Sequence, residues 1–469
     1  MVPAVIAWFL KEKNPGVDFL LAFFIAESAG LFLMAAFSQR KELNYSLTFL
    51  LVSAVWMIVP LFGALPLWMS GHFKSFLGAF FDSMSGFTTT GLSVIQSLDT
   101  VPFSLNFWRH FMMFLGGQGI IIVALSFAAT AASLGLGLYA GEAREEKILP
   151  DIFSTVRFIW LVSIVCFLLG SAALFFLSRH SGLPLKKAIF HSAFLFMAAF
   201  DTGGFTPQAM NIFYYHSIAI ETATVVLMLL GSLNFNLHYC LWKKKRAEIF
   251  KNIETRTFFL SATFLFLFLS ASVLISLRFS FGEFFRKIFY QLISAHTGCG
   301  FSNISVKELA GWPNLALIPL ILAMALGGGI GSTTGGIKMM RVALLMKAIK
   351  SEIKSWIFPA RVKIYEKYHH IQDLVLKDKR VRLVFVVFLF YIFSYFAGAV
   401  IGMFYGHSFL SSLFESVSAC ANVGLSLGIT SASMPAGLKI TYIIQMWAGR
   451  LEFISIIVSL GLIFSAFKK

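Results

Sequence analysis

The stretch Ser85-Gly86-Phe87-Thr88-Thr89-Thr90-Gly91-Leu92-Ser93 lies between two long apolar segments. Similar stretches occur three more times, at residues 198–206 (AAFDTGGFT), 294–302 (SAHTGCGFS) and 418–426 (SACANVGLS). In each copy a small pair opens the stretch, a glycine follows six residues after its first member, and Leu or Phe and then a hydroxyl residue come next. Apolar segments flank every copy, so the repeating unit reads as membrane helix, half-helix with loop, membrane helix. These four filter stretches predict a pore built from internal repeats.

The physical argument rests on the glycines of the filter stretches. Backbone inside a bilayer must be hydrogen-bonded unless it is buried in protein or lines water. Glycine adopts positive φ and can turn carbonyls toward an axis, and rings of carbonyls can replace the hydration shell of a potassium ion. The alternative, four extracellular turns that happen to contain glycine, does not account for the shared spacing. The candidate ion-binding residues are Thr88, Thr89, Thr90, Gly91, Asp201, Thr202, Gly203, Gly204, Thr297, Gly298, Cys299, Gly300, Ala421, Asn422, Val423 and Gly424.

The composition excludes an ordinary soluble globular protein. The chain is 58% hydrophobic and only 13% charged, with a mean hydropathy of +0.80. The net charge of +16 lies in loops between apolar spans, which fits the positive-inside rule better than a nucleic-acid partner. The four cysteines show no CxxC spacing, so neither a zinc site nor a disulfide framework is expected. We expect a multi-pass protein of the lipid bilayer.

The chain divides into N-terminal helices and four pseudo-symmetric repeats of an all-α membrane protein. Met1–Leu10 is apolar but too short to span about 30 Å of hydrocarbon. It lacks the basic start and cleavage site of a signal peptide, so it reads as the end of a truncated helix. A turn over Lys11–Gly16 precedes a full span over Asp18–Phe37, which ends at Arg40 and Lys41. The expected divisions are 1–44 (N-terminal helices), 45–139 (repeat 1), 140–243 (repeat 2), 244–350 (repeat 3), 351–380 (basic cytosolic link) and 381–469 (repeat 4).

Each repeat is expected to contain two spans around a half-helix, such as Phe73–Phe87 or Ser408–Cys420. Half-helices that end at the filter place partial negative charge there, which favours a cation. The expected pairs of spans are 45–69 with 107–138, 156–177 with 217–242, 256–277 with 314–347, and 381–405 with 437–467.

The loop charges predict the orientation. Lys243–Arg246, with Lys251 and Arg256, crowd one link, and twelve basic residues against four acidic ones lie between Lys338 and Arg382. Both links should be cytosolic, which directs the filter stretches outward. The rule holds on balance, because basic residues also lie on the opposite side: Arg179, Lys186, Lys187, Arg278, Arg286 and Lys287.

A glycine-rich run, Leu326–Lys338, interrupts the second span of repeat 3. Each glycine costs about 1 kcal/mol in a helix relative to alanine, so six of them should break it. The run lacks the ending of a phosphate-binding loop. Two interpretations stay open: a mobile loop beside a cavity in the membrane, and tight helix packing through small residues. The candidate gating residues are Gly327, Gly328, Gly329, Gly331, Ser332, Thr333, Thr334, Gly335, Gly336, Lys338 and Arg450.

Arg450 lies in the middle of the last expected span. A charge at that depth usually faces a water cavity or a partner, and the alternative is a structural pair with a carboxylate from another helix. Glu452 cannot share its helix face, because residues two apart point in different directions.

Carboxylates recur nine residues before the filter glycine. Asp82 and Glu415 occupy this place in repeats 1 and 4, Gln291 in repeat 3 and Leu195 in repeat 2. Such a group could anchor the half-helix to backbone donors or contact the ion, and we favour the anchor. Asp201 lies three residues before Gly204, where it could draw cations or accept amide hydrogen bonds. The histidines, His296 among them, show no metal-ligand spacing.

These residues together resemble the Trk/Ktr/HKT superfamily of potassium transporters, and specifically its bacterial TrkH-like branch. The motifs are 87–91 (FTTTG), 116–120 (GGQGI), 331–338 (GSTTGGIK), 422–424 (NVG) and 449–452 (GRLE). The resemblance implies a homodimer in the inner membrane, with one pore per protomer, and a cytosolic ring of nucleotide-binding regulators of the TrkA type. It implies potassium as substrate and no cofactor in this chain. Asp201 and Cys299 depart from the family pattern.

Potassium uptake is therefore the expected function, with two rival classes. A membrane enzyme would use Asp201 or His296 as acid or base, but no second catalytic group accompanies either in the sequence. A secondary transporter of another small cation or solute would also have broken helices that bind at mid-membrane. Four filter stretches with outward glycines argue against it.

Overall fold

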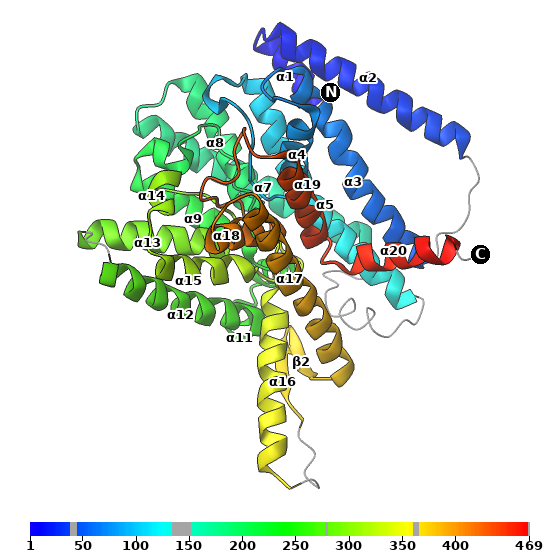
Figure 1. The fold of residues 1–469 in the computed structure, drawn as a ribbon, viewed down its shortest axis with the longest axis vertical. Coiled ribbons are helices and arrows are strands. Elements are labelled where there is room, and N and C mark those ends of the chain that lie inside the picture. Colours follow the sequence, from blue (N-terminus) through cyan, green and yellow to red (C-terminus); the bar gives the residue numbers. More distant parts are fainter. Residues whose placement is uncertain (38–44, 134–151, 277–279, 360–364, 468–469) are drawn as a thin grey trace.

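The computed structural model describes residues 1–37, 45–133, 152–276, 280–359 and 365–467, most of which are helical (Figure 1). The all-α prediction is confirmed. Several predicted features lie outside the described residues: the end of the first full span at Arg40 and Lys41, the last part of the span to Leu138, Leu277 and Arg278, and residues 360–364 of the basic link.

Two N-terminal helices, α1 (Val2–Phe9) and α2 (Lys13–Ala36), lie at one edge of the molecule (Figure 1). The turn between them is shorter than the predicted Lys11–Gly16, because α2 already begins at Lys13. Pro15 is tolerated there, since the first helical turn leaves its N–H groups without intrahelical partners.

The four repeats follow in chain order, each with a pore helix that comes after its first long helix. Repeat 1 comprises α3 (Tyr45–Met69), α4 (Phe76–Phe87), η1 (Leu98–Thr100) and α5 (Phe103–Ser133). Repeat 2 comprises α7 (Ile152–His180), α8 (Leu185–Phe200), η2 (Asn211–Tyr215), α9 (Ile218–Ser232) and α10 (Phe235–Trp242). After α11 (Ala247–Lys251), repeat 3 comprises α12 (Ile253–Ser276), α13 (Phe281–His296), α14 (Val306–Ala310), α15 (Asn314–Ala325) and α16 (Met339–Ile357). Repeat 4 comprises α17 (Asp378–Phe404), α18 (Phe409–Cys420), α19 (Ala436–Arg450) and α20 (Ile454–Phe467).

The side chains are distributed as in a membrane protein. The pore helices are central and buried, with Phe81, Phe194 and Phe414 fully enclosed. Large apolar side chains are instead exposed on the outer helices, for example Phe32 on α2 and Phe264 on α12. Within the described part of the chain, five helices are long and apolar enough to cross a bilayer, or up to seven if each bent pair counts as one span. The protein is therefore a multi-pass membrane protein.

The second span is broken in three repeats, whereas the sequence predicted only the break in repeat 3. In repeat 2, α9 and α10 meet at 99°, and in repeat 4, α19 and α20 meet at 105°. The predictions of continuous spans over 217–242 and 437–467 are therefore wrong. Asn234 caps α10 by accepting from Asn236 N, and Glu452 and Phe453 adopt positive φ at the second break.

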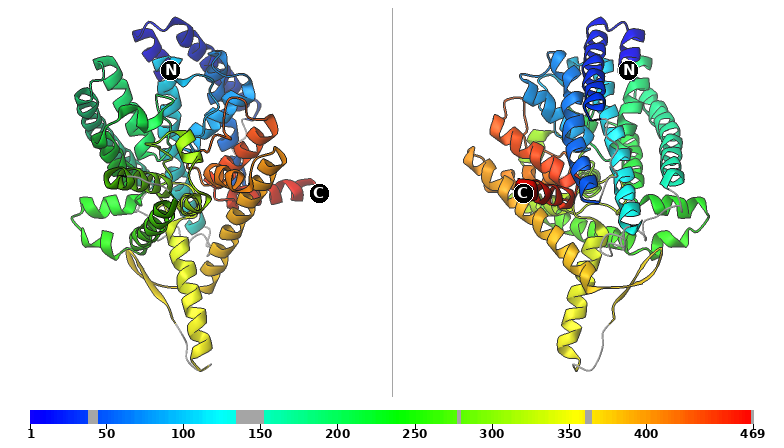
Figure 2. Two further views of the ribbon diagram at one scale, coloured as in Figure 1. Left: turned by 60° about the vertical axis from the view of Figure 1, so that its left-hand side comes forward. Right: turned by 90° about the vertical axis from the view of Figure 1, so that its right-hand side faces the viewer.

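An extension consists of α16, which protrudes from the body, and of the hairpin of β1 (Lys367–His370) and β2 (Gln372–Val375) beside it (Figures 1 and 2). α16 runs past residue 350, the predicted boundary between repeat 3 and the basic link. The hairpin docks on α11, because His369 Nε2 lies 2.9 Å from Glu248 Oε1 and Ile371 N donates to the same oxygen over 3.1 Å.

Docking of this hairpin should depend on pH. The hydrogen bond to Asp373, and after it the one to Glu248, raise the pKa of His369 above 6.5. Because Asp373 lies on β2 opposite His369, the raised pKa stabilises the paired and docked hairpin. This contribution is fully present below the ordinary pKa and is lost as pH rises through the raised value. We expect hairpin amides of wild type to exchange hydrogen several-fold more slowly than those of His369→Gln at low pH, with the difference shrinking as pH rises. The exposed His180→Gln is the control. A difference that is constant or grows with pH would contradict this.

Candidate functional site

The four filter stretches share one backbone conformation. The second residue after each pore helix has positive φ, and so does each filter glycine. The first set is Thr89 (52°), Thr202 (49°), Gly298 (70°) and Asn422 (55°), and the second is Gly91 (90°), Gly204 (71°), Gly300 (79°) and Gly424 (99°). Few residues other than glycine adopt such angles without strain, so the common glycine has a structural cause.

The filter glycines form a closed ring. A Cβ on any of them would collide with the carbonyl oxygen of the residue that precedes the filter glycine in another repeat. The pairs are Gly91 with Gly203, Gly204 with Cys299, Gly300 with Val423, and Gly424 with Thr90. The order of repeats is therefore 1, 2, 3, 4 and back to 1, which places all four filter stretches around a common axis.

The pore helices end at this ring. α4, α8, α13 and α18 stop immediately before the candidate ion-binding residues, so the negative ends of four helix dipoles converge there. On three neighbouring helices a glycine lies against the last carbonyl of a pore helix, and any side chain at that position would collide with it. The pairs are Gly116 of α5 with Phe87, Gly231 of α9 with Phe200, and Gly449 of α19 with Cys420.

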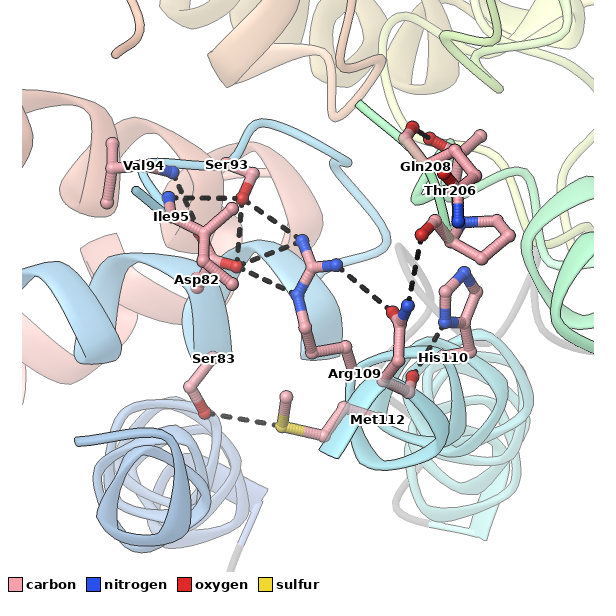
Figure 3. A network of polar contacts seen from close by, with 12 residues as sticks. Asp82, Ser83, Ser93, Val94, Ile95, Arg109, His110, Met112, Thr206 and Gln208 are labelled. Carbon is pink, nitrogen blue, oxygen red and sulfur yellow. Dashed lines mark hydrogen bonds and ion pairs between the residues drawn. The ribbon is translucent and has the colours of Figure 1, made fainter. Parts of the chain in front are cut away.

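Asp82 is the anchor of the first filter stretch (Figure 3). Its Oδ1 accepts from Val94 N over 2.9 Å, and its Oδ2 accepts from Ser93 Oγ over 3.0 Å. Arg109 of α5 donates to the same carboxylate over 3.1 Å, and both side chains are buried. Arg109 was not among the candidate residues predicted from the sequence, although a lone arginine in an apolar span is itself a functional signal.

The other anchors use the same spacing. Glu415 Oε1 accepts from Ser426 Oγ and from Leu427 N, eleven and twelve residues further on. Gln291 Nε2 donates to Ser302 Oγ and Asn303 Oδ1, again eleven and twelve residues away. The geometry therefore supports the anchor over ion contact.

The remaining residues that the sequence pointed to lie in the ring or beside it. Thr88 and Thr297 donate back to carbonyls of their own pore helices, Met84 O and Ile293 O. His296 Nε2 lies 2.9 Å from Ser261 Oγ, and its ring stacks on Phe258, so it is packed behind the filter. Two further contacts concern the departures from the family pattern: Cys299 Sγ lies 3.6 Å from Ala198 O, and Asp201 Oδ1 accepts from Gln118 Nε2 over 2.9 Å.

The glycine-rich run, residues 326–338, forms a buried loop, which we call the gate loop after the role that the sequence predicts for it. Its ends are bridged, since Gly327 N donates to Ile337 O over 2.8 Å. Its middle is bonded to the break in repeat 2: Gly329 N donates to Ser232 O over 3.0 Å, and Phe235 N donates to Gly331 O over 3.2 Å. This irregular backbone has partners from another repeat, as the bilayer requires.

The gate loop lies against the inner end of two filter stretches. Thr333 Oγ1 donates to Phe200 O over 3.0 Å, and a side chain at Gly335 would collide with Ala421 O. Phe200 and Ala421 each precede the filter glycine of their own stretch and lie at or just after the end of a pore helix. The gate loop therefore lies on the side of the ring where the pore helices end.

Arg450 is the last residue of α19 and not the middle of a continuous span, because the span bends after it. Its Nη1 donates to Thr333 O over 2.7 Å, and its Nη2 donates to Gly116 O over 3.3 Å. Among the described residues Arg450 forms no ion pair within 4.0 Å; Glu452 instead pairs with Arg341. Arg450 thus connects repeat 4 with the gate loop and with repeat 1.

Lys338, one of the candidate gating residues, is buried at the N-cap of α16, where the gate loop ends. Its Nζ donates to Thr334 O and, over 3.2 Å, to Thr334 Oγ1. Within the described residues no group of three or more His, Cys, Asp or Glu side chains could hold a metal ion.

Comparison with known proteins gives consistent matches along the whole chain. Residues 15–464 match the model of the TrkH family, described as a cation transport protein. The chain is 31% identical to an uncharacterised cation transporter of Methanocaldococcus jannaschii, over 98% of this chain and 91% of that protein. It is 30% identical to the Trk system potassium uptake protein TrkG of Escherichia coli, over 97% and 93%. The crystal structure of the potassium transporter TrkH from Vibrio parahaemolyticus superposes with a TM-score of 0.82 at 28% identity, covering 97% and 94%.

The anchor of repeat 4 should contribute strongly to stability. In Glu415→Gln an NH2 group replaces one of the two carboxylate oxygens, both of which accept hydrogen bonds. Leaving a buried polar group without a partner costs about 1–3 kcal/mol. Thermal unfolding of the detergent-solubilised variant should therefore occur clearly below that of wild type. Glu308→Gln, which removes a partly exposed pair with Lys287, should cost at most about 1 kcal/mol. Equal losses in the two variants would contradict the role of Glu415.

Proposed function

The chain belongs to the TrkH family of cation transport proteins, and from this premise we propose that it takes up potassium ions across the bacterial inner membrane. The observation that carries the proposal is the closed ring in which the carbonyls of Thr90, Gly203, Cys299 and Val423 each lie against a filter glycine of another repeat. Carbonyl rings can replace the hydration shell of potassium, and the four helix C-termini at the ring favour a cation. The relatives named as potassium uptake proteins support the same ion.

The gate of this pore is the gate loop together with Arg450. The loop lies at the inner end of the ring, and Arg450 bonds its Thr333 carbonyl. A fixed positive charge at this place repels a potassium ion, and the same side chain holds the loop closed. Arg450 therefore opposes conduction in two ways, both of which end when it moves away.

A cytosolic regulator of the TrkA type controls the gate, and the protein works as a homodimer with one pore in each protomer. The described contacts support a route from the cytosolic surface to the loop. Glu254, which is 3% exposed, accepts from Ile330 N of the gate loop over 2.7 Å. His370 of the hairpin lies 3.8 Å from the other oxygen of Glu254. A shift of the hairpin thus reaches the gate loop through one buried carboxylate.

Gly91→Ser should lower the preference for potassium over sodium. A side chain at position 91 collides with Gly203 O, and φ of +90° is strained for serine, so the junction of repeats 1 and 2 must open. We expect the potassium-to-sodium permeability ratio in proteoliposomes to fall about tenfold, equivalent to about 1.4 kcal/mol. Gly71→Ser is the matched control, because Gly71 has φ of +73° but open space around it. An unchanged ratio in Gly91→Ser would count against the ring as the filter.

Arg450→Ala should raise potassium flux and weaken its dependence on the regulator. The change removes both the charge and the bond to the gate loop, and coupling between sites is typically 1–3 kcal/mol, so a several-fold effect is expected. Deletion of residues 331–335 should act in the same direction, and Arg450→Lys, which keeps the charge, should have a smaller effect. The measurement is potassium uptake in a transport-deficient strain with and without the regulator. Variants that reach the membrane normally yet keep wild-type flux and regulation would place the gate elsewhere.

Charge reversal on the cytosolic face should abolish binding of the regulator. Lys243, Lys244, Lys245 and Arg246 are all exposed, and complementary charge chiefly sets association rate and specificity. We expect the variant with glutamate at all four positions to lose co-purification with the regulator. Reversal of the exposed residues Arg179, Lys186 and Lys187 on the other side is the control. Stoichiometric binding by the first variant would rule out this docking surface.

A further inference from the structure

Arg109 is a fully buried arginine that holds the outer part of the first filter stretch. Its Nε donates to Asp82 Oδ2 over 3.1 Å, and its Nη2 donates to Ser93 Oγ over 3.0 Å. Ser93 follows Gly91 by two residues. The guanidinium therefore fixes both the pore helix of repeat 1 and the chain that leaves its filter.

The same guanidinium contacts the second filter stretch. Its Cζ lies 4.1 Å from the centroid of the Phe205 ring, and Phe205 directly follows Gly204. Asn106 extends the contact, since its Oδ1 accepts from Arg109 Nη1 and its Nδ2 donates to Pro207 O, each over 3.3 Å. Figure 3 shows the guanidinium between Asp82 with Ser93 on one side and the Thr206–Gln208 segment on the other.

These contacts lie beside a junction of the ring. Gly91 of repeat 1 meets Gly203 of repeat 2, and Arg109 joins the segments that continue outward from both. A guanidinium is planar and rigid: its fork matches a carboxylate and a hydroxyl in one plane, while its face stacks on an aromatic ring. The spacing between the two stretches is thereby tied to one inflexible group, which a lysine cannot replace.

We propose that Arg109 is a positioning residue that sets the spacing of filter stretches 1 and 2 and thereby determines ion selectivity. This inference rests on the proposed potassium uptake function. Arg109 does not touch the ion; it acts through Asp82, Ser93 and Phe205. Its role differs from that of the anchors Gln291 and Glu415, which hold only the stretch of their own repeat.

The test compares selectivity with stability in two variants. Arg109→Lys keeps a cation beside Asp82 but loses the fork and the stacking face. Phe205→Leu keeps the ion pair and removes only the stacking partner. Each protein is reconstituted into liposomes, the permeability ratio of potassium to sodium is measured, and thermal unfolding is recorded in parallel. Lys287→Met, which removes the partly exposed pair with Glu308, is the control.

We expect Arg109→Lys to lower the permeability ratio roughly threefold or more, Phe205→Leu to lower it less, and the control to leave it unchanged. A purely structural role would lower the unfolding temperature but leave the ratio of the folded protein at the wild-type value, and that result overturns the proposal. If Arg109→Lys does not fold, an unchanged ratio in Phe205→Leu overturns it. Absence of potassium selectivity in wild type would instead refute the proposed function.

Discussion

The structure depends on the close approach of four backbone segments that leave no room for a side chain between them. At each junction of the ring a filter glycine faces the carbonyl of another repeat. Backbone segments this close have no side chains between them to fix their positions, so they must be held from behind. Asp82, Gln291 and Glu415 do this from the pore helices, and the glycines of the long helices let those pore helices come close enough.

A second constraint explains the inner end of the pore. Irregular backbone within a bilayer needs partners from the protein, and here the three broken spans supply them to one another. The break in repeat 2 bonds to the gate loop of repeat 3, and Arg450 at the break in repeat 4 bonds to the same loop. The breaks in repeats 2 and 4 and the gate loop form one hydrogen-bonded unit, so a movement at one break would displace the others.

The sequence predicted what repetition and composition reveal. The filter stretches were recognisable because four copies share one spacing, and the gate loop because six glycines cannot continue a helix. The bends after Ser232 and Arg450 were not predicted, because Leu233 and Leu451 are ordinary in helices and Asn234, although a preferred N-cap residue, lies in an otherwise apolar run. Those bends are stabilised by tertiary partners, such as Gly331 for one and the Arg341–Glu452 pair for the other. Arg109 carried a signal, a charge in an apolar span, but its two-sided contact with repeats 1 and 2 exists only in three dimensions.

The central claim is that the ring of four carbonyls selects potassium. The most direct measurement is uptake of labelled rubidium into liposomes that contain the purified wild-type protein, with potassium or sodium added outside as competitor. The account predicts that potassium suppresses the uptake at concentrations where sodium has little effect. Equal suppression by the two ions, or the same uptake in liposomes without the protein, would contradict it.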